Sequence, residues 1–329
     1  MNVLHRPSAA GLPVDAATLA EARAFNRKLA YAPRFRLTND FVLRLGQGLL
    51  RLSQIGADRK LARRRLAVRE TEAVADGLRV PVRILRPPAT PRAVVLDVHG
   101  GGWVIGNARM DDDRNAALAL ECQALVVSVD YRLATDAAMR DIMDDCLAAA
   151  RWTLDGGLEE GGDLPVFLVG ESAGGHLAAA TLLRLKAWPA LFARVKGAVL
   201  FYGVYDLAGT PSVRAAGPET LLLDGPGMVP DMAHLTRDVD DAGRRAPPLS
   251  PLYGDLAGMP PALMFGGELD PLRDDTREMA ARWAEAAEVE MHLLPEAPHG
   301  FIQFPTRMAQ LALARARQWI CERIDGRTG

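Results

Sequence analysis

PVFLVGESAGGHLAAATLLRL, residues 165–185, is the stretch that decides the fold. Its apolar start predicts a buried strand, and after a glycine-rich turn the apolar residues recur at helical spacing. The turn has the form G-x-S-x-G, which on a strand–turn–helix indicates a nucleophile elbow. Small flanking residues allow the sharp turn that lifts Ser172 above the sheet. The N-terminus of the following helix favours negative charge that develops there.

Similar apolar runs recur along the chain with helical stretches between them. The runs are residues 93–98, 124–131, 165–170, 195–203 and 261–267, with shorter β-like runs over 66–86 and a more alternating outer strand at 288–295. Helices are expected at about 137–154, 174–187, 273–287 and 306–324. Continuous Val, Leu and Ile runs that alternate with helices predict an α/β fold with a mostly parallel sheet covered on both faces. Ligands of such sheets bind beyond the carboxyl ends of the strands.

Two segments do not follow this alternation. Residues 16–55 have apolar positions at helical spacing, interrupted at Pro33, which predicts two helices. Residues 204–250 are rich in Gly and Pro and predict an insertion. We therefore expect residues 1–60 to form N-terminal cap helices, residues 61–329 to form the catalytic domain, and residues 204–250 to add to the cap.

Composition narrows the possible partners. The 329 residues have a formal net charge of −2, which argues against a general polyanion binder, although residues 1–70 are basic. We interpret that basic segment as a solvated helix face and expect no nucleic-acid partner. Three scattered cysteines predict neither a disulfide framework nor a zinc site. No stretch has the pattern of a signal peptide or a membrane span, so we expect a cytoplasmic protein without stable membrane insertion.

A serine needs a base to take its proton. His299 is the best candidate among six histidines, because it lies in the loop PEAPHGF directly after the last predicted strand. The others fit less well: His5 is in the N-terminal tail, His234 is in the insertion, His176 is expected to pack or cap, His292 is expected to be exposed on its strand, and His99 precedes a glycine loop.

The base in turn needs an acid that fixes its tautomer. Four acids follow the run 261–267, in the order Glu268, Asp270, Asp274 and Asp275. Asp270 lies in the loop before a helix, from which a carboxylate can reach a histidine one strand away. Asp274 and Asp275 fall in the first helical turn, where acids are favoured in any case. We therefore predict Asp270.

HGGGW, residues 99–103, follows the buried run 93–98. Three consecutive glycines are conformationally costly, which suggests that their amides must be approached closely. Attack on a carbonyl builds negative charge that such amides stabilise. Gly101 and Gly102, with the amide of Ala173, are the predicted oxyanion hole. His99 is expected to hold this loop. Trp103 is interpreted either as a wall of the substrate pocket or as simple packing.

These motifs together resemble the hormone-sensitive lipase family of α/β-hydrolases. HGGGW, DYRLA (130–134), GESAGG (170–175), SPL (250–252), GELDPLRDD (267–275) and HGF (299–301) stand in that family's order. The resemblance implies an α/β-hydrolase core with a helical cap and carboxylic ester hydrolysis without a metal or organic cofactor. Ser172, Asp270, His299 and the glycine loop match the family's functional positions one by one.

The chain departs from the family's pattern at two places. Thr135 and Asp136 stand where the family usually has Pro-Glu, which affects a local turn. Glu171 stands in the elbow where Asp or Thr is commoner, and it is a candidate pocket residue with Trp103.

The resulting hypothesis is a serine carboxylesterase acting on small to medium apolar esters through an acyl-enzyme. The same residues would serve an amidase or formamidase, and a non-catalytic receptor on this fold is a further alternative. A homodimer paired through the last strand is possible.

Overall fold

The computed structural model describes residues 11–37 and 40–327 and divides into two compact units. The first unit comprises residues up to 38 together with 200–316, and the second comprises 39–199 together with 317–329. Strand β6 (Val195–Phe201) and helix α12 (Arg307–Ile324) begin in one unit and end in the other. Each unit is described by itself below.

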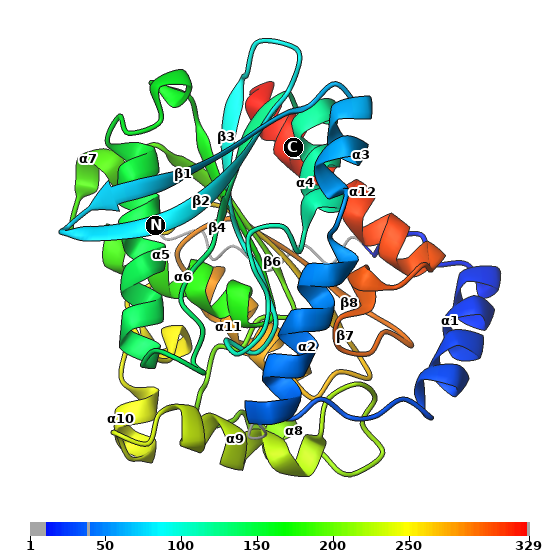
Figure 1. Ribbon diagram of the computed structural model, residues 1–329. Coiled ribbons are helices and arrows are strands. Elements are labelled where there is room, and N and C mark those ends of the chain that lie inside the picture. The colour runs from blue at the N-terminus through cyan, green and yellow to red at the C-terminus, as the bar shows by residue number, and fades with distance from the viewer. Residues whose placement is uncertain (1–10, 38–39, 328–329) are drawn as a thin grey trace. The chain divides into compact units, whose positions relative to one another are not determined.

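The second unit contains the elements that lie between residues 40 and 192 (Figure 1). Its strands are β1 (Ala67–Ala75), β2 (Leu78–Arg86), β3 (Ala93–Val98), β4 (Ala124–Val129) and β5 (Val166–Glu171). Its helices are α2 (Asp40–Ser53), α3 (Ala57–Arg63), α4 (Asp112–Glu121), α5 (Met139–Leu154), α6 (Ala173–Leu185) and the short α7 (Pro189–Phe192). A 3₁₀ turn covers Glu159–Gly161.

The strands of this unit lie in the order β1-β2-β4-β3-β5. β1 and β2 form an antiparallel hairpin, β2 pairs antiparallel with β4, and β3 pairs in parallel with both β4 and β5. Every residue of β3, β4 and β5 is buried. Figure 1 shows α5 and α6 on one side of these strands and α4 on the other, which explains why the strands are mostly apolar.

The first unit carries the remaining strands and the insertion. Its elements are α1 (Ala16–Leu29), α8 (Pro211–Arg214), α9 (Met228–Leu235), α10 (Asp241–Arg245), β7 (Ala262–Gly267), α11 (Arg273–Trp283) and β8 (Val289–Leu294), with 3₁₀ turns at Gly225–Gly227, Pro251–Tyr253 and Phe301–Gln303. β7 and β8 are parallel, and the Tyr202 amide at the end of β6 donates to the Phe265 carbonyl of β7 at 2.6 Å.

The inserted segment is joined to the N-terminal segment inside this unit. The Phe35 amide donates to the Leu222 carbonyl at 2.7 Å, and the Asp224 amide donates to the Phe35 carbonyl at 3.2 Å. The Leu37 amide donates to the Asp231 carboxylate at 3.0 Å. Two segments that are far apart in sequence and were both predicted as cap therefore pair with each other.

The predicted α/β class with a mostly parallel sheet flanked by helices is confirmed. The predicted strands agree with the observed ones to within one or two residues, and the helix pair around Pro33 is present as α1 and α2. Helices α3 and α4 were not predicted. No helix in the part of the chain that the structure describes is long and apolar enough to span a membrane.

Candidate active site

Ser172 lies between β5 and α6, where G-x-S-x-G predicted it. Its backbone is in the left-handed region, with φ 52° and ψ −121°. Both flanking glycines are required sterically. A Cβ on Gly170 would lie 2.3 Å from the Gly174 carbonyl oxygen, and one on Gly174 would lie 2.0 Å from the Val98 carbonyl oxygen. The strained serine and its two close backbone approaches are the geometry of a nucleophile elbow.

The glycine loop begins where β3 ends, directly beside the elbow. In the β3–β5 register Val98 is opposite Gly170, so the two strands release their loops at the same edge. Gly101 and Gly102 have φ of 102° and 60°. A Cβ on Gly101 would lie 1.9 Å from the Ile105 carbonyl oxygen, which explains the need for glycine there. Ala173, the third predicted oxyanion donor, is fully buried as the first residue of α6.

His99 is a structural part of the loop. It is buried, and its Nδ1 donates to the Gly100 carbonyl at 2.8 Å. Its ring stacks on Tyr131 with centroids 4.1 Å apart, and the Tyr131 hydroxyl donates to the His99 carbonyl at 2.8 Å. Burial lowers the pKa of His99 against the opposing effect of the Gly100 contact, so the imidazole is neutral. Tyr131 was not singled out from the sequence, although it lies in the DYRLA motif.

The two candidate pocket residues are both buried. Trp103 is 2% exposed and donates through Nε1 to Nδ1 of His176 at 3.2 Å. Glu171 is 3% exposed, and its Oε2 lies 3.7 Å from Nη1 of Arg114. The pocket role stays a prediction for both.

In the first unit, His299 and Asp270 form a hydrogen-bonded pair. Nδ1 of His299 lies 2.9 Å from Oδ2 of Asp270, and both side chains are buried. The other carboxylate oxygen of Asp270 accepts the Leu272 amide at 2.8 Å, which orients the acid. Tyr202 packs against the imidazole with centroids 4.8 Å apart. Asp270 therefore holds His299 in the tautomer that leaves Nε2 to accept a proton.

The three competing acids have other partners. Glu268 forms an exposed bidentate pair with Arg277 at 3.0 and 3.1 Å. Asp274 accepts the Ser212 amide at 2.9 Å. Asp275 accepts the Tyr205 and Asp206 amides and the Thr210 hydroxyl. Burial raises the pKa of Asp275 to about 7, against the opposing effect of these donors.

The prediction that His292 is exposed was wrong. It is 4% exposed, stacks on Phe265, and its Nε2 lies 2.6 Å from Glu290. Arg315 of α12 pairs with the same carboxylate at 2.6 Å. The alternation of residues along β8 could not predict that another element packs against the face that carries His292. His234 is exposed, and His5 lies outside the described residues.

The structure also contains buried polar groups that the sequence did not single out. Arg83 and Asp97 are 1% exposed, and the Arg114 side chain is 8% exposed. All three are joined to acids or polar side chains of neighbouring elements. Across the described ranges 11–37 and 40–327, no group of three or more His, Cys, Asp or Glu residues is arranged to hold a metal ion.

The fold and the elbow define an α/β-hydrolase. A family model described as alpha/beta hydrolase fold matches residues 95–303, and the chain belongs to that family. A carboxylesterase from Mycobacterium tuberculosis is 34% identical over 77% of this chain and 81% of its own length. An ethyl acetate hydrolase from Pseudomonas putida is 33% identical over 69% and 73%.

A solved esterase from the bacterial hormone-sensitive lipase family has the same fold. Its TM-score is 0.74 at 24% identity, over 94% of this chain and 99% of that one. Together with the match to the family model, this agrees with the α/β-hydrolase fold that the motifs predicted.

Proposed function

We propose that this α/β-hydrolase is a serine carboxylesterase in which Ser172, His299 and Asp270 act as nucleophile, base and acid. Ser172 attacks the ester carbonyl while His299 accepts its proton and Asp270 stabilises the imidazolium. The amides of Gly101, Gly102 and Ala173 bind the oxyanion. His299 then protonates the leaving alcohol, and water hydrolyses the acyl-enzyme by the same steps in reverse.

The observation that carries the proposal is the β3–β5 register. It sets a loop of left-handed glycines beside a serine held in a left-handed elbow. Amides on one side and a hydroxyl on the other are the arrangement that acyl transfer needs. The buried His299–Asp270 pair supports the assignment of base and acid. The names of the matched relatives, carboxylesterase and ethyl acetate hydrolase, support an ester as the substrate.

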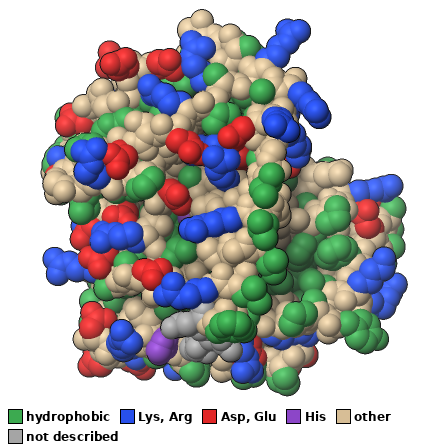
Figure 2. Space-filling model, in the orientation of Figure 1, with side chains coloured by type: hydrophobic (Ala, Val, Ile, Leu, Met, Phe, Trp, Pro, Cys, Tyr) green, Lys and Arg blue, Asp and Glu red, His purple; other side chains and the backbone are tan. Residues whose placement is uncertain are grey.

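The exposed apolar side chains of helix α2 support the proposals that the substrate is apolar and that this helix belongs to the cap. Figure 2 shows a band of hydrophobic side chains over this helix. Six large apolar residues of α2 and the turn after it are each more than half exposed: Phe41, Val42, Leu45, Leu49, Leu52 and Ile55. The helix is tied to the residues after the glycine loop, because Gln47 exchanges two 2.8 Å hydrogen bonds with the backbone of Gly106. We infer that α2 is the part of the cap that meets the acyl chain.

Hydrolysis of p-nitrophenyl esters of increasing acyl length tests the function, with the wild type and Ser172→Ala side by side. We expect turnover of short and medium chains and a loss of several orders of magnitude in the variant, with an unchanged circular dichroism spectrum. Full activity in Ser172→Ala would overturn the elbow assignment. A folded wild type that cleaves only a matched p-nitroanilide would indicate an amidase, and one that cleaves neither would favour a receptor.

Two further predictions concern the whole protein. The homodimer predicted from the edge position of the last strand is tested by sedimentation velocity at several protein concentrations. The cytoplasmic location is tested by fractionation of the producing cells.

A further inference from the structure

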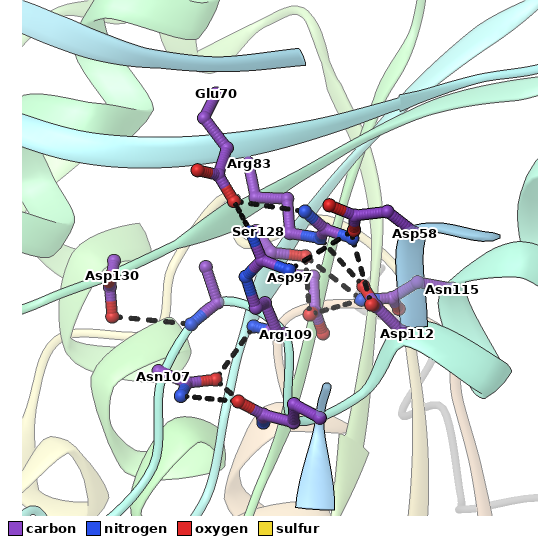
Figure 3. Close-up of polar contacts among 12 residues, drawn as sticks. Asp58, Glu70, Arg83, Asp97, Asn107, Arg109, Asp112, Asn115, Ser128 and Asp130 are labelled. Carbon is purple, nitrogen blue, oxygen red and sulfur yellow. Dashed lines mark hydrogen bonds and ion pairs between the residues drawn. The ribbon is translucent and has the colours of Figure 1, made fainter. Parts of the chain in front are cut away.

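Helix α4 is fixed to its neighbouring strands by polar side chains of its first turn (Figure 3). Asp112 accepts two hydrogen bonds, at 2.9 and 3.0 Å, from Arg83 of β2. Asn115 donates at 2.6 Å to Asp97 of β3 and at 2.9 Å to Ser128 of β4. Because Asp97 is 1% exposed, a carboxylate here must be satisfied by protein groups.

Arg114 occupies the centre of this buried region. Its Nη2 lies 2.5 Å from Asp97 and 2.9 Å from Asp111, and its Nη1 lies 3.7 Å from Glu171. The Arg114 side chain is 8% exposed, and those of the three acids are between 1% and 4% exposed. One guanidinium is thus surrounded by three acidic side chains that have almost no access to water. The arrangement is unlike a surface ion pair, which water would screen.

The three acids belong to the backbone segments that hold the proposed catalytic groups. Asp97 is two residues before His99, where the glycine loop starts, and Asp111 closes the segment between that loop and α4. Glu171 directly precedes Ser172. The loop also rests on Glu171, since a Cβ on Gly100 would lie 3.1 Å from both its carbonyl oxygen and its Oε1.

We propose that Arg114 is a positioning residue for the proposed esterase reaction, on which this inference rests. By pairing with Asp97, Asp111 and Glu171 it fixes the glycine loop relative to the elbow. Its positive charge also offsets acids that lie behind the position where the oxyanion develops. Arg114 does not touch the reacting atoms. Its effect is on the alignment of the oxyanion amides with Ser172 and on the electrostatic potential at that point.

Replacing Arg114 therefore slows the chemical step more than it weakens ester binding. In Arg114→Met we expect kcat per active site to fall about 10- to 100-fold with KM changed less than about threefold, because a small misplacement of catalytic groups costs up to about 10²-fold. Inhibition by a trifluoromethyl ketone, which binds serine hydrolases as an oxyanion adduct, should weaken by the same factor as kcat/KM. Arg114→Lys keeps the positive charge but not the planar guanidinium, so its kcat should lie between those of the wild type and Arg114→Met.

The experiment measures kcat, KM and the ketone Ki for wild type, Arg114→Met, Arg114→Lys and Arg114→Met/Glu171→Gln. Rates are divided by the concentration of active sites titrated from the p-nitrophenol burst. The double variant removes one repelling carboxylate and should recover part of kcat. Arg315→Met is the matched control: it breaks a half-buried pair with Glu290, at 2.6 Å, outside the elbow and the glycine loop. It should lose stability but keep its kcat per site.

The outcomes separate this inference from the function on which it rests. An inactive wild type would refute the esterase itself. With an active wild type, an Arg114→Met protein that shows fewer titrated sites but unchanged kcat and Ki has only a folding defect, and the positioning role is refuted. If Arg114→Met does not fold, Arg114→Lys decides the matter: unchanged kcat and Ki overturn the proposal, and a parallel loss in both supports it.

Discussion

At the scale of single residues, the acids that follow β7 differ in their burial and in their partners. Asp270 is fully buried, touches His299 through one oxygen, and has its other oxygen held by the Leu272 amide. Glu268, two residues earlier, is on the surface with Arg277. The sequence favoured Asp270 by its position in the loop before α11, and its burial and the orientation of its carboxylate support that choice.

Asp270→Asn is accordingly expected to lower kcat by on the order of 10³- to 10⁴-fold. An amide at this position can present N–H to His299 and so favour the wrong tautomer. Glu268→Gln removes only an exposed ion pair and should change kcat less than about threefold. Steady-state hydrolysis of one p-nitrophenyl ester by both purified variants compares them directly. Equal losses, or a larger loss in Glu268→Gln, would assign the acid elsewhere.

The residues that the sequence made predictable are those whose backbone demands one residue type. A Cβ on Gly170 or Gly174 would lie 2.3 or 2.0 Å from a backbone carbonyl oxygen, so only glycine fits at either position. Such a requirement can be recognised in the sequence as a motif. Arg114 leaves none. Its role depends on Asp97 of β3, on Asp111 in the loop before α4 and on Glu171 in the elbow. A single sequence gives no sign that these side chains meet.

At the scale of elements, runs buried on both faces were easy to predict, and elements with polar interiors were not. All six residues of each of β3, β4 and β5 are buried, so each strand is apolar at most of its positions. Helix α4 starts with DDRN, which looks like a solvated surface segment. Its buried residues Asp112 and Asn115 find their partners on other strands. The same reason explains why His292 was predicted to be exposed, since its partner is Glu290, which is itself paired with Arg315 of α12.

The contact between β8 and α12 makes stability depend on pH. Burial tends to raise the pKa of Glu290, but hydrogen bonds from Arg315 and His292 outweigh it and lower the pKa to about 2. A lowered carboxyl pKa stabilises the fold above the ordinary value of 4.5, and this contribution is lost as the pH falls from about 4.5 towards 2. We expect Glu290→Gln to cost about 1 to 2 kcal/mol at pH 7, allowing for screening by water.

Urea unfolding of wild type and Glu290→Gln at pH 7, 4.5 and 3 measures this contribution. The difference in free energy of unfolding should shrink between pH 4.5 and pH 3, because Glu290 becomes protonated in the unfolded wild type while it stays mostly ionised in the folded one. Glu285→Gln, a change at an exposed acid nearby in sequence, is the control and should change neither stability nor its pH dependence. A difference between Glu290→Gln and wild type that stays constant down to pH 3 would contradict the assignment.

At the scale of the whole molecule, the core and the cap differ in how far sequence determines them. The core could be predicted because apolar runs alternate with helical stretches along the sequence. The proposed cap follows less completely, because its segments, residues 1–60 and 204–250, are far apart in the sequence and the second contains only short helices. The hydrogen bonds of Phe35 with Leu222 and Asp224, and of Leu37 with Asp231, show that the two segments pair. We expect the proposed cap, the most irregular part of the chain, to set the substrate preference.

The exposed face of α2 gives a test of the cap at this scale. Leu45 and Leu49 are 56% and 58% exposed, so replacing them with Ser should leave stability nearly unchanged. If α2 meets the acyl chain, Leu45→Ser/Leu49→Ser raises KM for octanoate esters about 4- to 10-fold and leaves KM for acetate esters unchanged. That factor corresponds to roughly one or two methylene groups removed from apolar contact.

Val74→Ser is the control, because Val74 is 51% exposed on β1 and belongs to no proposed cap segment. It should leave the whole acyl-length profile unchanged. The quantity that decides is the ratio of octanoate to acetate kcat/KM, which cancels differences in enzyme concentration and in the fraction of folded protein. A fall in that ratio confined to the α2 variant would place α2 against the acyl chain. An unchanged ratio would mean that the acyl chain contacts another part of the protein. The exposed apolar face of α2 would then need another explanation.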